Sequence, residues 1–260
     1  MTRPCFRSRL GLLIAPALCA LSLLASAMAH AESVTLAVAT NFIVPVREIA
    51  SAFEAASGHR VRISTGSTGK LYAQIAHGAP FDVFLAADSE RPARAEAEGL
   101  AVPGSRITYA IGKLVLYSAE PARIDAQASV LRRGDYTRLA IANTDTAPYG
   151  LAAVETLRAL GLYTAAAPRL IRGDNIAQTY QFVATGNAPL GFVALSQVID
   201  HAEGSRWVVP ETLYAPIHQD AVLLARAARN PAAGAFMQFL GSDAARRILI
   251  RYGYAPPPSR

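Results

Sequence analysis

Cysteine is nearly absent from this chain of 260 residues. Its two cysteines, Cys5 and Cys19, both lie near the amino terminus, in a segment that we expect to be removed. The remaining chain would then have no disulfide, no thiolate metal site and no cysteine nucleophile. Leu18 is a poor neighbour for lipid attachment to Cys19, where a small residue is expected. We therefore expect a soluble exported protein and not a lipoprotein.

Motifs of catalysis are missing as well. No G-x-S-x-G elbow is present, and the five histidines show no pairing with a serine at the level of a motif. No two histidines have metal-ligand spacing, and Asp82, Asp88 and Asp174 form no cluster in the sequence. An exported hydrolase remains the alternative from a different class, but these absences predict that the protein is not an enzyme.

The amino terminus has the pattern of a signal peptide. Three arginines precede an apolar run over residues 10–24, and Ala29-His30-Ala31 fits an A-x-A cleavage site. We predict a leader over residues 1–31, a mature chain that starts at Glu32, and a periplasmic location. The cleavage site disfavours an uncleaved anchor, and no later apolar run is long enough to span a bilayer.

Net charge is modest once the leader is set aside. The chain has 25 basic and 19 acidic side chains, and without the three leader arginines the count is 22 against 19. No basic block appears, so we expect no nucleic-acid partner.

The mature chain alternates strand-like and helix-like segments. Such alternation predicts mostly parallel sheets with helices on both faces, an α/β class. The extended stretch 107–118, kinked at Gly112, reads as a crossover into a second lobe. We therefore predict a discontinuous first lobe and a continuous second lobe. Their limits are 32–113 with 220–260, and 114–219. Strands are expected at 34–39, 60–65, 81–87, 139–143, 169–172, 190–194 and 221–225.

Polar residues stand at four places where a strand ends and a helix begins. In parallel sheets such ends face one crevice, and helix starts attract anions. Each place read singly is an ordinary helix cap, but the four together predict a cleft that holds a small dianion between lobes. The second of them is no phosphate-binding P-loop, because its glycine spacing differs and Leu71 follows Lys70. The four places are Thr40-Asn41, Ser67-Thr68, Pro148-Tyr149 and Asn175-Ile176.

Several segments carry a resemblance to a known family. They are Ala37 to Phe42, Gly66 to Ile75, Gly78 to Phe84, Tyr109 to Leu116, Ala147 to Ala152 and Leu190 to Ala194. In this order they resemble the periplasmic molybdate-binding proteins of molybdate ABC transporters. The resemblance covers essentially the whole mature chain and implies the two-lobed, type II solute-binding fold. It further implies a monomer that binds molybdate, and usually tungstate, for a membrane permease and its ATPase.

The resemblance also implies the binding residues. Carried over by position, they are Thr40, Asn41, Thr68, Tyr149 and Ile176, with Ser67 as a neighbour. Some members place a ligand tyrosine at the position of Ala194, whereas a second subgroup has a tyrosine at the position of Tyr149, as here. No cofactor and no bare metal ion are implied, because molybdenum would be bound only as molybdate.

Fully deprotonated oxyanions suit a site that offers only donors, while protonated phosphate also needs an acceptor. Asp145 and Asp174 lie close to the predicted site in the sequence, and whether they reach it decides how well phosphate is excluded. Nothing in the residue spacing separates molybdate from sulfate, so that choice depends on the resemblance. A receptor for another tetrahedral oxyanion, such as sulfate, is the main alternative.

Overall fold

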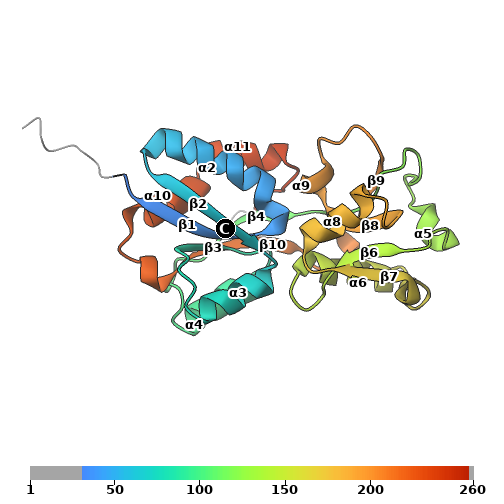
Figure 1. Cartoon of the computed structure of the whole chain (residues 1–260), viewed down its shortest axis with the longest axis horizontal. Coiled ribbons are helices and arrows are strands. Elements are labelled where there is room, and N and C mark those ends of the chain that lie inside the picture. The colour runs from blue at the N-terminus through green and yellow to red at the C-terminus, as the bar shows by residue number, and fades with distance from the viewer. Residues whose placement is uncertain (1–30, 258–260) are drawn as a thin grey trace, which may run out of the picture. The chain divides into compact units, whose positions relative to one another are not determined.

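Two five-stranded sheets, each with helices on both faces, make up the computed structural model of this protein (Figure 1). Residues 31–257 are described, and those from Glu32 onward belong to one unit. The leader predicted over residues 1–31 therefore lies outside the described residues, except for Ala31.

The first sheet has the strand order β2-β1-β3-β10-β4. β1 pairs in parallel with β2 and β3, and β10 runs antiparallel between β3 and β4, so four of the five strands point the same way. The strands are β1 (Ser33–Ala39), β2 (Arg60–Gly66), β3 (Val83–Leu85), β4 (Ile107–Gly112) and β10 (Ile217–Leu223).

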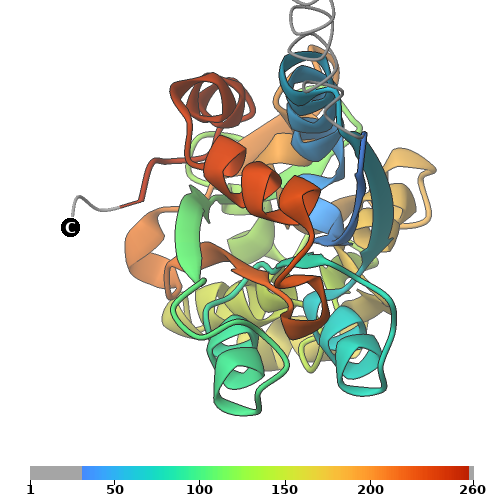
Figure 2. The same ribbon diagram turned by 90° about the vertical axis from the view of Figure 1, so that its left-hand side faces the viewer.

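Helices cover both faces of this sheet (Figure 2). On one face lie α2 (Ile43–Ser57), α10 (Pro231–Leu240) and α11 (Asp243–Arg251), and on the other lie α3 (Thr68–Ala76) and α4 (Glu90–Ala97). A short 3-10 helix, η1 (Thr40–Phe42), links β1 to α2.

The second sheet has the strand order β7-β6-β8-β5-β9 and, like the first, four strands that point the same way. β6 pairs in parallel with β7 and β8, while β5 runs antiparallel between β8 and β9. Its strands are β5 (Leu114–Ser118), β6 (Leu139–Ala142), β7 (Leu170–Gly173), β8 (Leu190–Ala194) and β9 (Ser205–Val208). Its helices are α5 (Ser129–Arg133), α6 (Pro148–Ala159), α7 (Tyr163–Ala166), α8 (Ile176–Ala184) and α9 (Leu195–Val198).

The sequence patterns explain these elements. Val46, Ile49 and Phe53 recur at helical spacing and form the buried stripe of α2. Gly58 ends that helix in the left-handed region, with φ of 73°, which glycine adopts without a steric cost. The α/β, two-sheet fold class predicted from the sequence is confirmed.

Residues 107–118 are extended, as predicted, in two strands, β4 and β5, which belong to different sheets and are separated by Lys113. Two details of the prediction were wrong. β10 spans Ile217–Leu223 and not 221–225, because its polar residues Gln219 and Asp220 are buried against neighbours and conceal the strand pattern. β9 was not predicted, since its alternate residues are exposed and its apolar content is low.

The residue limits of the two lobes stay a prediction. The sheets support it, because β1 to β4 with β10 make one sheet and β5 to β9 make the other. We refer below to the elements of the first sheet, with η1, α2, α3, α4, α10 and α11, as lobe 1, and to those of the second as lobe 2.

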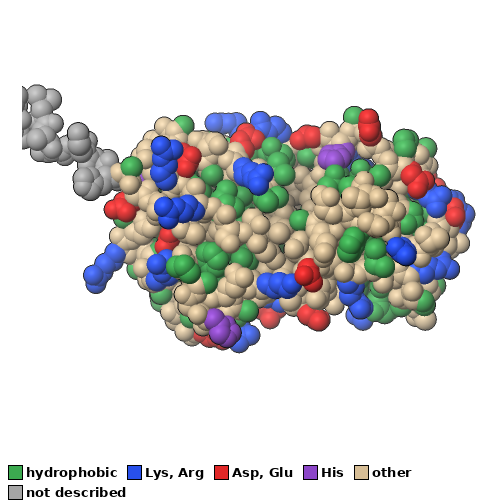
Figure 3. Space-filling view, in the orientation of Figure 1, with side chains coloured by type: hydrophobic (Ala, Val, Ile, Leu, Met, Phe, Trp, Pro, Cys, Tyr) green, Lys and Arg blue, Asp and Glu red, His purple; other side chains and the backbone are tan. Residues whose placement is uncertain are grey.

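The visible surface mixes basic and acidic side chains (Figure 3). Within residues 31–257 no helix is both long enough and apolar enough to cross a membrane.

Candidate binding site

A small cavity lies where strand ends of the two lobes face each other. Lobe 1 supplies Ala39, Thr40, Asn41, Ser67, Thr68 and Ala87, and lobe 2 supplies Ala147, Pro148, Tyr149 and Ile176. All six residues predicted for the site therefore line one cavity. They come together because β1, β2, β6 and β7 end there and the next helix begins.

The hydroxyl groups of lobe 1 are poised to donate. Ser67 is buried, and its Oγ has no hydrogen-bond partner among the described residues. Thr68 Oγ1 accepts a hydrogen bond from the Ala87 N–H at 3.1 Å, so its own hydrogen is left to donate. A buried hydroxyl without a hydrogen-bond partner is unfavourable. These two hydroxyls therefore indicate a ligand that accepts hydrogen bonds from them.

Three of the four helices that begin at the cavity have no side-chain N-cap. No side-chain cap bond forms at the start of η1, α3 or α6. The ordinary capping role considered for Thr40-Asn41 and Ser67 is therefore wrong, because their side chains do not reach the helix N–H groups. The first N–H groups of a helix have no partner inside it and carry partial positive charge, so they can bind an anion. Of the four helix starts at the cavity, only that of α8 has a side-chain cap: Asn175 Oδ1 accepts from the Gln178 N–H at 3.0 Å.

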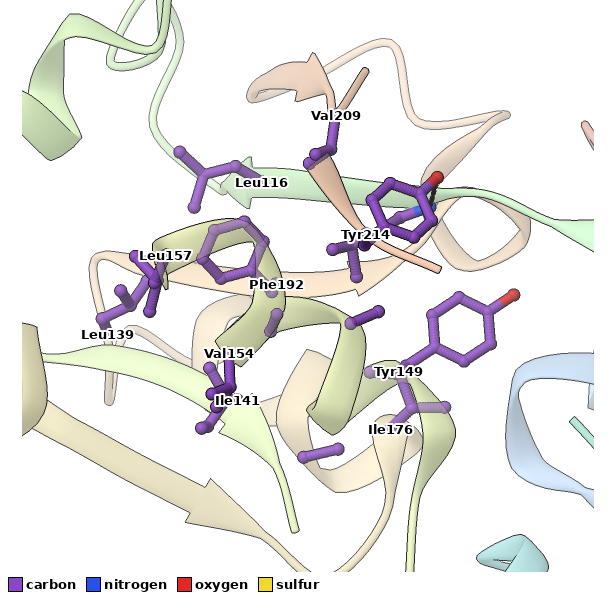
Figure 4. Close-up of a cluster of buried hydrophobic side chains, with 14 of the residues drawn as sticks. Leu116, Leu139, Ile141, Tyr149, Val154, Leu157, Ile176, Phe192, Val209 and Tyr214 are labelled. Carbon is purple, nitrogen blue, oxygen red and sulfur yellow. Dashed lines mark hydrogen bonds between the residues drawn. The ribbon is translucent and has the colours of Figure 1, made fainter. Parts of the chain in front are cut away.

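Tyr149 and Ile176 form the wall of lobe 2. They lie next to each other at one end of a buried cluster, and the Tyr149 hydroxyl points away from the other side chains drawn (Figure 4). That hydroxyl is buried and, although the Tyr254 hydroxyl lies near it, makes no hydrogen bond of good geometry within the described chain. Burial raises the pKa of Tyr149 well above its ordinary value, so the group stays protonated and keeps a hydrogen to donate.

No charged side chain is among the described residues that line the cavity. Asp145 and Asp174 are exposed and do not reach it, and Asp174 pairs with Lys70 at 3.0 Å. The site thus offers hydroxyl and backbone donors without a carboxylate acceptor. Such a set suits a fully deprotonated oxyanion and disfavours a protonated one.

Contacts between the lobes surround the cavity. The Gly69 N–H donates to the Thr146 carbonyl at 2.9 Å, and Arg91 Nη2 donates to the Asp145 carbonyl at 2.9 Å. Gly69 leaves little space here, since a Cβ at that position would lie 3.0 Å from Thr146 Cα. In the described arrangement the two lobes therefore touch beside the cavity, as in a closed form.

The side chain of Asn41 is engaged within the protein. Its Nδ2 donates to Gln219 Oε1 at 2.7 Å and to the Tyr254 hydroxyl at 3.0 Å. What Asn41 offers to the cavity is therefore its backbone N–H, at the start of η1. Neither Gln219 nor Tyr254 was predicted from the sequence, because both lie more than 170 residues from Asn41 and carry no local motif.

Among the described residues, no group of three or more His, Cys, Asp or Glu side chains could hold a metal ion. No histidine is among the described residues that line the cavity.

Comparison with known proteins identifies the class. Residues 34–255 match the family described as bacterial extracellular solute-binding protein. The chain belongs to this family.

Individual relatives within this family have a more specific description. The molybdate-binding protein ModA of Rhodobacter capsulatus is 51% identical over 226 residues, which cover 87% of this chain and 89% of that protein. ModA of Azotobacter vinelandii is 53% identical over 229 residues, covering 87% and 91%. The solved structure of the Azotobacter vinelandii periplasmic molybdate-binding protein matches with a TM-score of 0.83 and 42% identity, over 86% of this chain and 99% of that one. The resemblance to the periplasmic molybdate-binding proteins is thereby confirmed.

Proposed function

We propose that this chain is the molybdate receptor of an ABC importer and that it binds tungstate as well. The observation that carries the proposal is the pair of buried, unpartnered hydroxyls, Ser67 Oγ and Tyr149 OH, which belong to opposite walls of one uncharged cavity. A tetrahedral dianion accepts hydrogen bonds in several directions, so one ion could satisfy both hydroxyls together with the uncapped helix starts.

The ligand contacts follow from the lining residues. Thr68 and Ser67 donate from their hydroxyls, and Tyr149 does so from its phenol. Thr40 and Asn41 in η1 and Ile176 in α8 are placed to donate backbone N–H groups at helix starts. No cofactor takes part, and molybdenum enters only as the oxyanion.

Transport is the second part of the proposal. The chain is exported by its leader, cleaved after Ala31, and works as a monomer in the periplasm. It hands the anion to a membrane permease and the ATPase of that importer. Closure of the lobes on the ligand would give the permease a form to recognise, as in other two-state receptors. The absence of a paired nucleophile and base from the described cavity supports binding rather than catalysis.

Calorimetric titration tests the function. The mature, anion-free protein is titrated in turn with molybdate, tungstate, sulfate and phosphate. We expect one-to-one binding of molybdate and tungstate and at least a hundredfold weaker binding of sulfate and phosphate. Tight sulfate binding would show that the protein is a receptor for a different oxyanion. No binding of any oxyanion would overturn the proposal. A protein with Ser51→Ala is the control, because Ser51 is an exposed residue of α2 that does not line the cavity.

A further inference from the structure

A buried network of polar groups joins Asn41 to both lobes. Ser196 Oγ donates to the Asn41 carbonyl at 2.8 Å, and the Tyr254 hydroxyl lies 3.0 Å from the same oxygen and 3.2 Å from Ser196 Oγ. All three residues are more than nine-tenths buried. One consistent cycle runs from the Asn41 amide to Tyr254, from Tyr254 to Ser196, and from Ser196 back to the Asn41 carbonyl.

The members come from different lobes. Asn41 belongs to η1 and Tyr254 follows α11, both in lobe 1, whereas Ser196 belongs to α9, directly after β8 of lobe 2. The bonds of Ser196 to Asn41 and Tyr254 therefore join the two lobes. The other bonds of Asn41, to Gln219 and Tyr254, lie within lobe 1 and do not depend on closure.

The bond from Ser196 acts on the backbone that faces the ligand. It fixes the carbonyl of Asn41 inside η1, a 3-10 helix of three residues without a side-chain cap. That carbonyl shares a peptide plane with the Phe42 N–H, so holding it constrains the short helix in which Thr40 and Asn41 line the cavity. Donors whose orientation is fixed in the closed form are better aimed at the ligand there than donors that are free to turn.

We propose that Ser196 is a positioning residue for anion binding: it orients η1 from the opposite lobe and makes that orientation conditional on closure. This inference rests on the proposed function, because it concerns the same cavity. Ser196 is not among the described residues that line the cavity. Its effect reaches the ligand only through Asn41.

The rate of ligand release tests this role. In Ser196→Ala the closed form loses the bond to Asn41, while the open form loses nothing between the lobes. We expect the molybdate Kd to rise about three- to tenfold, the loss that one neutral hydrogen bond predicts. We expect most of the rise to appear in the dissociation rate, measured by stopped flow, with the melting temperature of the anion-free protein unchanged.

Three further variants make the test specific. Ser196→Thr keeps the hydroxyl and should restore at least half of the lost affinity on a logarithmic scale. Ser51→Ala removes an exposed serine hydroxyl from α2 and should change nothing. Tyr254→Phe leaves the ring in place and removes a partner of Ser196, so in the double variant with Ser196→Ala the two effects should be coupled and not multiply.

The outcomes separate this inference from the function. If the wild-type protein binds molybdate and Ser196→Ala binds it equally well, the positioning role is wrong and the receptor stands. An equal loss of anion-free and anion-bound stability in Ser196→Ala would show a merely structural residue and would also overturn the role. A wild-type protein that binds no oxyanion would overturn the function, and this inference with it.

Discussion

The hydroxyl of Tyr149 occupies the space where any Cβ on Gly112 would have to lie. Gly112 ends β4 in lobe 1, directly before the chain enters β5 of lobe 2, and Tyr149 is at the start of α6. Glycine is required at position 112 because a side chain approaches it closely. Its φ is not in the left-handed region, so the backbone conformation alone would allow other residues. The crossover between lobes and the wall of the cavity are packed against each other.

Gly112→Ala tests this contact. The added methyl group should displace the Tyr149 ring, lower the free energy of unfolding by about 1 to 3 kcal/mol, and weaken molybdate binding at least tenfold. Urea unfolding and calorimetry measure the two effects. Gly234→Ala is the matched control, because a Cβ there meets nothing within 4 Å and alanine is favoured inside α10. An unchanged affinity in Gly112→Ala would mean that Tyr149 is not held for the ligand.

Thr68→Ala should weaken binding of molybdate about ten- to a hundredfold. The variant removes one hydrogen bond to a charged ligand, which corresponds to roughly 1.5 to 3 kcal/mol. Thr68→Ser keeps the hydroxyl and should retain most of the affinity. Titration calorimetry measures both affinities. Equal affinity in the wild type and in Thr68→Ala would show that Thr68 does not bind the anion.

Ser67→Ala should have effects of opposite sign on binding and on stability. Without ligand, Ser67 Oγ is buried and unpaired, so its removal should leave the melting temperature of the anion-free protein unchanged or raise it. With ligand, a donor is lost, so affinity should fall. Thermal unfolding with and without saturating molybdate checks both. A lower melting temperature in both states would indicate a packing role instead.

The ion pair between Lys70 and Asp174 should contribute little to closure. Its atoms lie 3.0 Å apart across the lobes, but the side chains are 49% and 68% exposed, and exposed pairs are worth at most about 1 kcal/mol. Lys70→Ala should therefore raise the molybdate Kd by less than about fivefold at low salt. At 0.5 M sodium chloride the difference from wild type should vanish, because salt screens exposed charges. A tenfold effect that persists in salt would assign Lys70 to the ligand.

Alkaline pH should destabilise the protein through Tyr254. Burial raises the pKa of Tyr254 from the ordinary 10.0 to about 12. The folded state then holds this proton more tightly than the unfolded state, so the stability is complete below pH 10 and is lost as pH rises from 10 toward 12. The loss amounts to about 2 to 3 kcal/mol for this one group.

Urea unfolding at several pH values from 8 to 12 measures that loss. Tyr254→Phe has no proton to lose at this position, so its stability should fall less steeply above pH 10 than that of the wild type. Equal slopes would show that Tyr254 does not contribute. Tyr163→Phe is a suitable control, since this side chain is only partly buried.

Local patterns in the sequence determined the order of elements and the walls of the cavity. Apolar runs such as residues 190–194 specify buried strands, and the stripe of Val46, Ile49 and Phe53 specifies a helix face. Because strand ends of parallel sheets face one edge, the polar residues at four helix starts could be placed at one cavity before the structure was known. Six predicted residues do line it, although their contact with the anion stays a proposal.

Tertiary structure alone decided how those residues are held. Asn41 is 155 residues from Ser196 and 213 from Tyr254, and no spacing in the sequence links groups so far apart. The same holds for the approach of Tyr149 to Gly112, which requires the lobes to meet. Hydrophobic periodicity reports which face of an element is buried, whereas hydrogen bonds between distant segments depend on the packing of whole lobes, and only the folded chain contains that information.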